Sequence, residues 1–269
     1  GHNAENWREQ QFNLSLLVSK YDNQPLAHMI HPGNHTSMTT MQHVIPRLSD
    51  FSIKNGTIIW DRGNTSNKTV NALENMGWKI ICGVPKISDE AKKIIISTEI
   101  PENPDYLVPS KNTGELYACK IQAELYGQMR DTVVYRNVTK ATKSLIRRNK
   151  AIYEISQELT ALKSNLNFIS QQNLKLAVKG ILNGWKRFFI IEYPKDEKIV
   201  NFSWSIDEKK IEEAKSMDGK FLLYSSDTTY SAQEVVKMYL EKDFIEKAFR
   251  TIKTDEDLKP IRHRLESRV

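Results

Sequence analysis

One charged stretch near the C-terminal end of the chain carries residue types suited to metal-dependent chemistry on an anionic substrate. If the stretch is a helix, residues three, four and seven positions apart fall on one face. That face then holds one carboxylate among three cations: Lys242, Glu246, Arg250 and Lys253. A soluble helix face usually mixes its charge signs more evenly. The spacing therefore indicates a metal ion and a polyanion meeting on one surface, with Tyr239 one turn earlier as a stacking or phosphate contact.

A second carboxylate, Asp61, directly follows the apolar run Thr57–Trp60, which predicts a short buried strand. Ligands collect beyond strand ends in α/β sheets, and Glu246 can reach the same place from a helix packed on that sheet. Phosphoryl transfer by two metal ions, held roughly 3.5–4 Å apart, needs carboxylates that converge from different elements. Hard oxygen ligands favour Mg²⁺ or Mn²⁺. We therefore predict that Asp61 and Glu246 ligate two such ions.

Each of these residues also has a plain structural interpretation. Asp61 can be only a turn residue or a helix cap, and Glu246 can be a solvated helix residue. Arg250 can simply pair with Glu246 or Asp243. A further basic segment begins at Lys140 and ends at Lys186-Arg187; it reads equally well as a solvated helix face or as a surface that tracks phosphates. Trp185 and Trp204 are assigned to packing, with a stacked flipped base as the alternative at either. Four histidines have a spacing that fits no zinc pattern: His28, His31, His35 and His43.

Composition narrows the class of protein. The 269 residues are 39% hydrophobic and 27% charged, which fits one large globular domain or a domain with an insertion. A net charge of +6 is a modest bias toward anionic partners. Two distant cysteines, Cys82 and Cys119, fit a reducing compartment and suggest neither a disulfide framework nor a zinc site. No apolar run approaches the roughly 20 residues that cross a bilayer, so no membrane partner is expected.

The apolar pattern predicts an α/β fold. Its first part reads as strands at 12–20 and 25–30, a helix from 36 or 37 to 48, a strand at 57–60, a helix from Ser66 to Gly77 and a strand at 78–84. Beyond residue 86 the pattern is less regular: short strand or helix at 116–129, mostly helix at 137–184, paired strands at 188–193 and 200–205, a helix at 207–215, a strand at 220–224 and a helix opened by Ser231 that carries Glu246.

Asp61 and Glu246 lie 185 residues apart, too far for one connection in a compact core. We therefore predict an inserted α+β subdomain at 86–216, between a first core part at 1–85 and a core completion with the catalytic helix at 217–269.

Five short motifs occur in an order that resembles one family: Gln24-Pro25-Leu26, Pro32-Gly33-Asn34, Trp60-Asp61-Arg62-Gly63, Asp218-Gly219 and Tyr239-x2-Lys242-x3-Glu246-x6-Lys253. Over nearly the whole chain they resemble the DDE transposases of bacterial or archaeal insertion sequences. The signature of that group is Tyr-x2-Arg-x3-Glu-x6-Lys, with Lys242 standing here in the arginine position.

The resemblance implies a ribonuclease H-like mixed sheet flanked by helices, with a large inserted subdomain before the last catalytic helix. It also implies cut-and-paste DNA transposition in the cytoplasm, at the nucleoid. Asp61 would be the second catalytic carboxylate and Glu246 the third. The predicted DNA contacts are Tyr239, Lys242, Arg250, Lys253 and Arg62. The expected partners are double-stranded DNA, as inverted-repeat ends and target, and a second copy of the chain in a dimer on DNA.

The family's first aspartate lies on a core strand before the hairpin that begins near Phe12, and no matching strand precedes that hairpin here. The expectation is a chain truncated at both ends and inactive as it stands. An alternative is therefore a DNA-binding remnant of a transposase without cleavage activity. A third and weaker alternative is a repair or resolvase-type nuclease on the same fold, which would recognise DNA structure.

Overall fold

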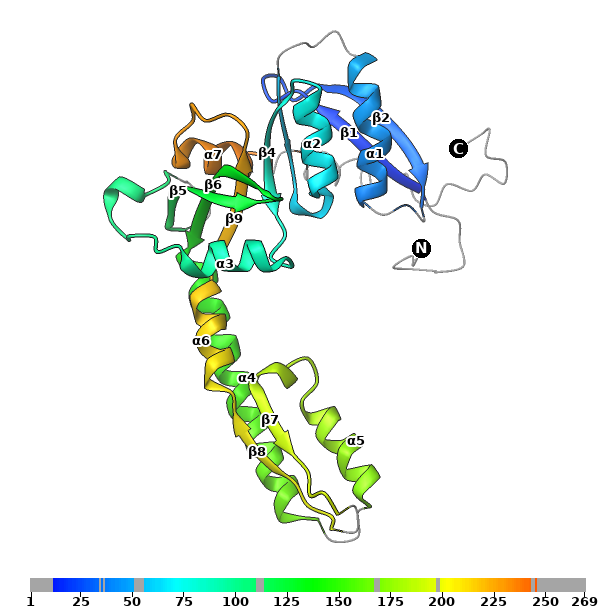
Figure 1. The fold of residues 1–269 in the computed structure, drawn as a ribbon, viewed down its shortest axis with the longest axis vertical. Helices are drawn as coiled ribbons and strands as arrows, with labels where there is room; N and C mark the ends of the chain where they lie inside the picture. The colour runs from blue at the N-terminus through cyan, green and yellow to red at the C-terminus, as the bar shows by residue number, and fades with distance from the viewer. Residues whose placement is uncertain are drawn as a thin grey trace.

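The centre of the protein is a five-stranded mixed sheet with the strand order β3-β4-β9-β6-β5 (Figure 1). The computed structural model describes residues 12–33, 35, 37–50, 56–109, 114–166, 170–196, 199–242 and 245. The strands are β3 (Thr57–Trp60), β4 (Lys79–Val84), β9 (Lys220–Ser225), β6 (Gln128–Asn137) and β5 (Leu116–Leu125). β3 and β4 run parallel and the other neighbours antiparallel. The predicted fold class, a ribonuclease H-like mixed sheet flanked by helices, is confirmed.

Helices cover both faces of this sheet because successive strand residues point to opposite sides. On β4, Ile80 and Cys82 face a core formed with α1 (Ser37–Arg47), α2 (Asn67–Asn75) and α3 (Asp89–Ser97). Ile81, between them, faces a second core formed with α7 (Ala232–Leu240). A separate antiparallel pair, β1 (Phe12–Val18) and β2 (Pro25–Pro32), lies beside α1 (Figure 1). The sheet is thus a buried platform, and its strand ends are where polar groups emerge.

Local sequence sets several element ends as predicted. Ser66 caps α2 by accepting a hydrogen bond from the backbone N–H of Thr69, and Gly77 follows the helix with a φ of +81°. Ser231 and Glu234 form a reciprocal capping box at the start of α7.

Short 3-10 turns join other elements: η1 (Leu48–Asp50), η2 (Arg62–Asn64), η3 (Pro104–Tyr106) and η4 (Lys186–Phe188).

Residues 138–217 form an arm that leads away from the sheet (Figure 1). It contains α4 (Val138–Ser164), α5 (Gln171–Ile181), β7 (Phe189–Glu192), β8 (Ser203–Ile206) and α6 (Glu208–Met217). The arm has its own apolar core, which includes Leu159, Phe188 and Phe202. At its base the buried Arg148 guanidinium binds both carboxylate oxygens of Asp218, at 3.0 and 2.6 Å.

The domain boundaries at residues 86 and 216 stay a prediction. In the structure, β5 and β6 belong to the same sheet as β3, β4 and β9, although they lie inside the predicted insertion. Among the described residues of 86–216, the part from α4 to α6 leads away from the sheet. Alternating apolar residues in β5 and β6 did not reveal from sequence which sheet the two strands would join, because pairing partners are set by long-range packing.

A buried ionic network ties α2 to the sheet. The Arg130 guanidinium, 7% exposed as a residue, donates to both carboxylate oxygens of Glu74 at 2.8 Å and to the Tyr224 hydroxyl at 2.7 Å. Tyr224 in turn donates to Glu74. These bonds join Arg130 of β6 and Tyr224 of β9 to Glu74 of α2, so the network fixes how α2 sits on β6 and β9.

α7, the helix opened by Ser231 and expected to carry Glu246, ends before that residue. α7 stops at Leu240, with Glu241 as its C-cap, and residues 241 and 242 form a turn. The sequence has no glycine or proline there. Instead the end coincides with tertiary contacts, since Glu241 pairs with Lys20 of the β1–β2 connection at 2.6 Å. None of the helices in the described ranges is long and apolar enough to cross a membrane.

Candidate functional site

The candidate site is built around Asp61, at the end of β3. The run Thr57–Trp60, with three β-branched residues and a tryptophan, forms the parallel partner of β4, and the chain then turns through η2. Asp61 is the N-cap of that turn, because its Oδ1 accepts a hydrogen bond from the backbone N–H of Arg62 at 2.8 Å. Behind it, the indole Nε1 of Trp60 donates to the Thr65 hydroxyl at 2.9 Å. The turn is therefore held from inside while the Asp61 carboxylate faces outward.

α7 brings a second group to the same carboxylate. The Tyr239 hydroxyl donates to Asp61 Oδ1 at 2.6 Å, although the two residues are 178 positions apart. Lys242 Nζ lies 3.8 Å from Oδ1 and 4.9 Å from the centre of the Tyr239 ring. The structure thus brings four sequence-predicted residues together: Asp61, Arg62, Tyr239 and Lys242.

The charge state of Asp61 follows from these contacts. Partial burial raises its pKa, but the hydrogen bonds from Tyr239 and from the Arg62 backbone lower it, and the positive charges of Lys242 and Arg62 act in the same direction. The net pKa lies below its usual value. With its side chain 56% exposed, Asp61 is an accessible, ionised oxygen ligand near neutral pH.

Gly83 on β4 makes room for this arrangement. A Cβ atom at residue 83 would lie 2.5 Å from the Tyr239 hydroxyl oxygen, and 3.1 and 3.2 Å from Cβ and the backbone nitrogen of Arg62. Those separations are too short for an unstrained side chain. Sequence reasoning missed Gly83, although a glycine inside a central strand signals close approach by another group.

Other predicted site residues lie outside the described part of the chain: Glu246, Arg250 and Lys253. In the described residues, no group of three or more His, Cys, Asp or Glu side chains could hold a metal ion. The histidines singled out by sequence partly cluster: the rings of His35 and His43 stack at 5.2 Å, and those of His31 and His43 lie 6.2 Å apart. His31 is buried and shares a hydrogen bond with Ser15.

A group of cations that sequence reasoning largely missed lies next to Arg62. Lys86 Nζ and Lys140 Nζ lie 4.6 and 5.1 Å from the centre of the same Phe221 ring. Burial lowers the pKa of Lys86 to about 8, and the charge of Arg62 adds to that shift. Asp218 opposes it, but the Asp218 carboxylate is already bound by Arg148. Lys86 could have been found from the sequence by its position, because it stands two residues beyond the end of β4.

The basic segment of the arm divides into different environments. Arg148 is buried against Asp218, whereas Lys143, Arg147 and Lys150 are exposed on α4. The guanidinium of Arg147 lies 5.8 Å from the Trp185 ring centre. Trp204, in contrast, packs against Phe189 within the arm.

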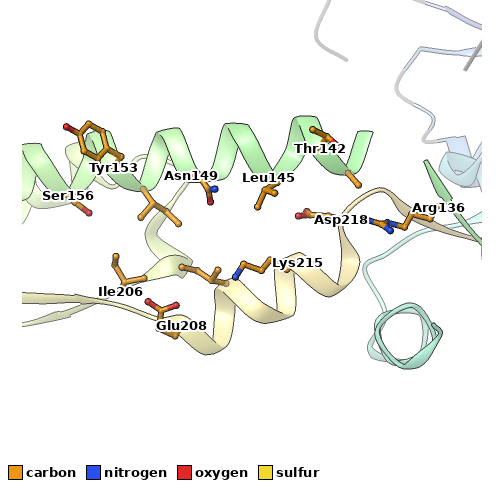
Figure 2. Close-up of a pocket in the computed structure, with 13 residues that line it drawn as sticks. Arg136, Thr142, Leu145, Asn149, Tyr153, Ser156, Ile206, Glu208, Lys215 and Asp218 are labelled. Atoms are coloured by element: carbon orange, nitrogen blue, oxygen red, sulfur yellow. The ribbon is translucent and has the colours of Figure 1, made fainter. Parts of the chain in front are cut away.

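A cavity of about 850 Å³ lies in the arm, between α4 and α6 (Figure 2). Leu145, Tyr153 and Ile206 are among the apolar residues that line it, together with the charged Glu208 and Lys215. None of its lining residues belongs to the group around Asp61. The hollow is therefore separate from the candidate site at the end of β3.

Comparison with known protein families gives a match over the whole chain. The family model described as "Transposase DDE domain" matches residues 1–269. No curated protein and no solved structure matches the chain.

Proposed function

The chain belongs to the family of transposase DDE domains, and from that premise we propose that it is the catalytic domain of an insertion-sequence transposase. Membership gives it a role in transposition, with DNA as its substrate. The proposed reaction is metal-dependent cleavage at the element's inverted-repeat ends, followed by attack of the freed 3′-hydroxyl on target DNA, carried out by a dimer on two ends. The observation that supports it best is the ionised Asp61 carboxylate at the end of β3, held by Tyr239 and flanked by Arg62 and Lys242.

The donor chemistry at this position fits Mg²⁺ or Mn²⁺. Asp61 offers an accessible carboxylate whose described hydrogen bonds both end on Oδ1, which leaves Oδ2 to face a cation. We propose that Asp61 and Glu246 hold two ions, although Glu246 is outside the described residues. When bound there, such ions would stabilise the charge that develops on the attacking and leaving oxygens. Arg62 and Lys242 would hold the DNA backbone at the site, as would Arg250 and Lys253 outside the described part.

The test is cleavage of DNA that carries the element's ends. Full-length protein incubated with Mg²⁺ or Mn²⁺ is expected to nick or cut at those ends, and a chelator is expected to stop the reaction. Binding of duplex with a steep salt dependence but no metal-dependent cleavage would replace this proposal with the DNA-binding alternative. Cleavage governed by branched or distorted structure, whatever the end sequence, would favour a repair or resolvase-type nuclease.

The cation group formed by Lys86, Lys140 and Arg62 gives a pH-dependent prediction for DNA binding. In the free protein, Lys86 has a pKa of about 8, and a bound phosphate raises that pKa. At a pH between the pKa of the free protein and the higher pKa of the complex, the complex therefore holds more protons. Affinity is therefore expected to fall as pH rises through about 8, by at most about tenfold per pH unit.

The measurement is the affinity for duplex DNA between pH 6.5 and 9.5 at fixed ionic strength. This range extends about one and a half pH units on each side of the Lys86 pKa of about 8. Lys86→Arg is the matched control, because its side chain stays charged and should flatten the profile. Lys86→Gln is expected to weaken binding at the lower pH and to reduce the salt slope by about one. An unchanged pH profile in Lys86→Arg would show that Lys86 does not contact the phosphate backbone.

A further inference from the structure

We propose that Tyr239 is a positioning residue that orients the Asp61 carboxylate, and that Gly83 supplies the clearance which lets the tyrosine reach it. Sequence spacing assigned Tyr239 to DNA. The geometry points to a different role, directed at the metal-binding carboxylate. This inference rests on the proposed function for its catalytic meaning, whereas the contact itself can be tested without DNA or metal.

The tyrosine is anchored as a core residue. It is 7% exposed, and it belongs to the apolar cluster between α7 and the sheet, together with Ile81 and Val235, both 0% exposed. The capping box at Ser231 fixes the start of the helix. A ring held in this way presents its hydroxyl at one place, without a loss of side-chain entropy when substrate arrives.

The hydroxyl reaches a chosen oxygen of the carboxylate. Tyr239 and the backbone N–H of Arg62 both donate to Asp61 Oδ1, at 2.6 and 2.8 Å. Two donors on one oxygen fix the rotation of the carboxylate and turn Oδ2 away from them. Hydrogen bonds from an outer group commonly orient a metal-binding side chain in this manner.

Gly83 gives the second and independent observation. It lies within β4 and pairs with Leu223, at an ordinary extended conformation that any residue can adopt. Glycine weakens a strand interior, so its presence needs a local reason. That reason is the 2.5 Å separation between a Cβ at this position and the Tyr239 hydroxyl oxygen. Alanine would therefore push the hydroxyl away from Asp61.

A direct phosphate contact fits this arrangement poorly. The Tyr239 hydroxyl donates its single proton to Asp61, so it has no proton left for a phosphate oxygen while that hydrogen bond is kept. Lys242, whose Nζ lies 4.9 Å from the centre of the Tyr239 ring, is a cation at this end of α7 that suits a phosphate.

The test uses Tyr239→Phe, Gly83→Ala and the double variant, with Tyr230→Phe as the matched control. Tyr230 packs against the same cluster but does not contact Asp61. In protein free of DNA and metal, Gly83→Ala is expected to lower the melting temperature by roughly 4 °C or more, because the added methyl group overpacks the site. In the Tyr239→Phe background most of that loss should disappear, since the clashing oxygen is gone.

With DNA present, Tyr239→Phe is expected to keep duplex affinity within about twofold, to reduce cleavage by about 10–100-fold and to need more Mn²⁺ for half-maximal cleavage. Gly83→Ala should give the same pattern, and Tyr230→Phe none of it. Additive melting-temperature losses in the double variant would overturn the contact. A loss of duplex affinity in Tyr239→Phe would return Tyr239 to DNA binding. If wild-type protein does not cleave DNA, the proposed function fails while the melting-temperature comparison still tests the contact.

Discussion

Asp61→Asn is expected to lower strand cleavage by on the order of 10³-fold or more while leaving duplex binding intact. Asparagine has nearly the same shape and still offers an oxygen to the Tyr239 hydroxyl and to the backbone N–H of Arg62. What it removes is the negative charge that would hold a divalent ion. Because Arg62 and Lys242 then lose a nearby anion, binding of DNA should be unchanged or slightly tighter.

Asp89→Asn is the matched control, since Asp89 is 90% exposed in the first turn of α3 and carries the same chemical change. Cleavage rates and duplex affinities of both variants should be measured across Mg²⁺ and Mn²⁺ concentrations. If Asp61→Asn cleaves as fast as Asp89→Asn, Asp61 is a structural cap of η2 and not a metal ligand.

Gly219→Ala is expected to destabilise the protein by roughly 3–5 kcal/mol. Gly219 has a φ of +67°, and its carbonyl accepts a hydrogen bond from the backbone N–H of Asn137 at 2.8 Å, where β6 passes into α4. An added Cβ would collide with the Asn137 carbonyl oxygen and lie 2.7 Å from Ala141 Cβ and 2.8 Å from its backbone nitrogen. Backbone atoms cannot rotate away, so the joint between arm and sheet must move.

Gly127→Ala separates the cost of the positive φ from the cost of the added Cβ contacts. Gly127 also has a positive φ, +72°, but a Cβ there meets nothing within 4 Å. Its expected loss is about 1–2 kcal/mol, from backbone conformation alone. The free energy of unfolding in urea gives the comparison. Equal losses in the two variants would show that the packing around Gly219 relaxes at little cost.

Much of the local structure could be predicted from short sequence patterns. The strand at 57–60, the cap at Ser66 and the helix opened by Ser231 depend on alternation and on side-chain caps, which are properties of neighbouring residues. The arrangement of β5 and β6 in the central sheet could not be read in that way. Strand pairing depends on contacts between residues that are far apart in the chain.

For the candidate site as well, the sequence predicted some features and the tertiary structure decided others. By itself the sequence determined which residues have the chemistry: a carboxylate directly after a strand, and a tyrosine, lysines and a glutamate at fixed spacing near the C-terminal end. Only the tertiary structure decided what Tyr239 touches and why residue 83 is glycine, because both depend on a helix meeting a strand end more than 150 residues away in sequence. The tertiary structure also decided which cations lie around Phe221, since Lys86 and Lys140 become neighbours only when the sheet is assembled.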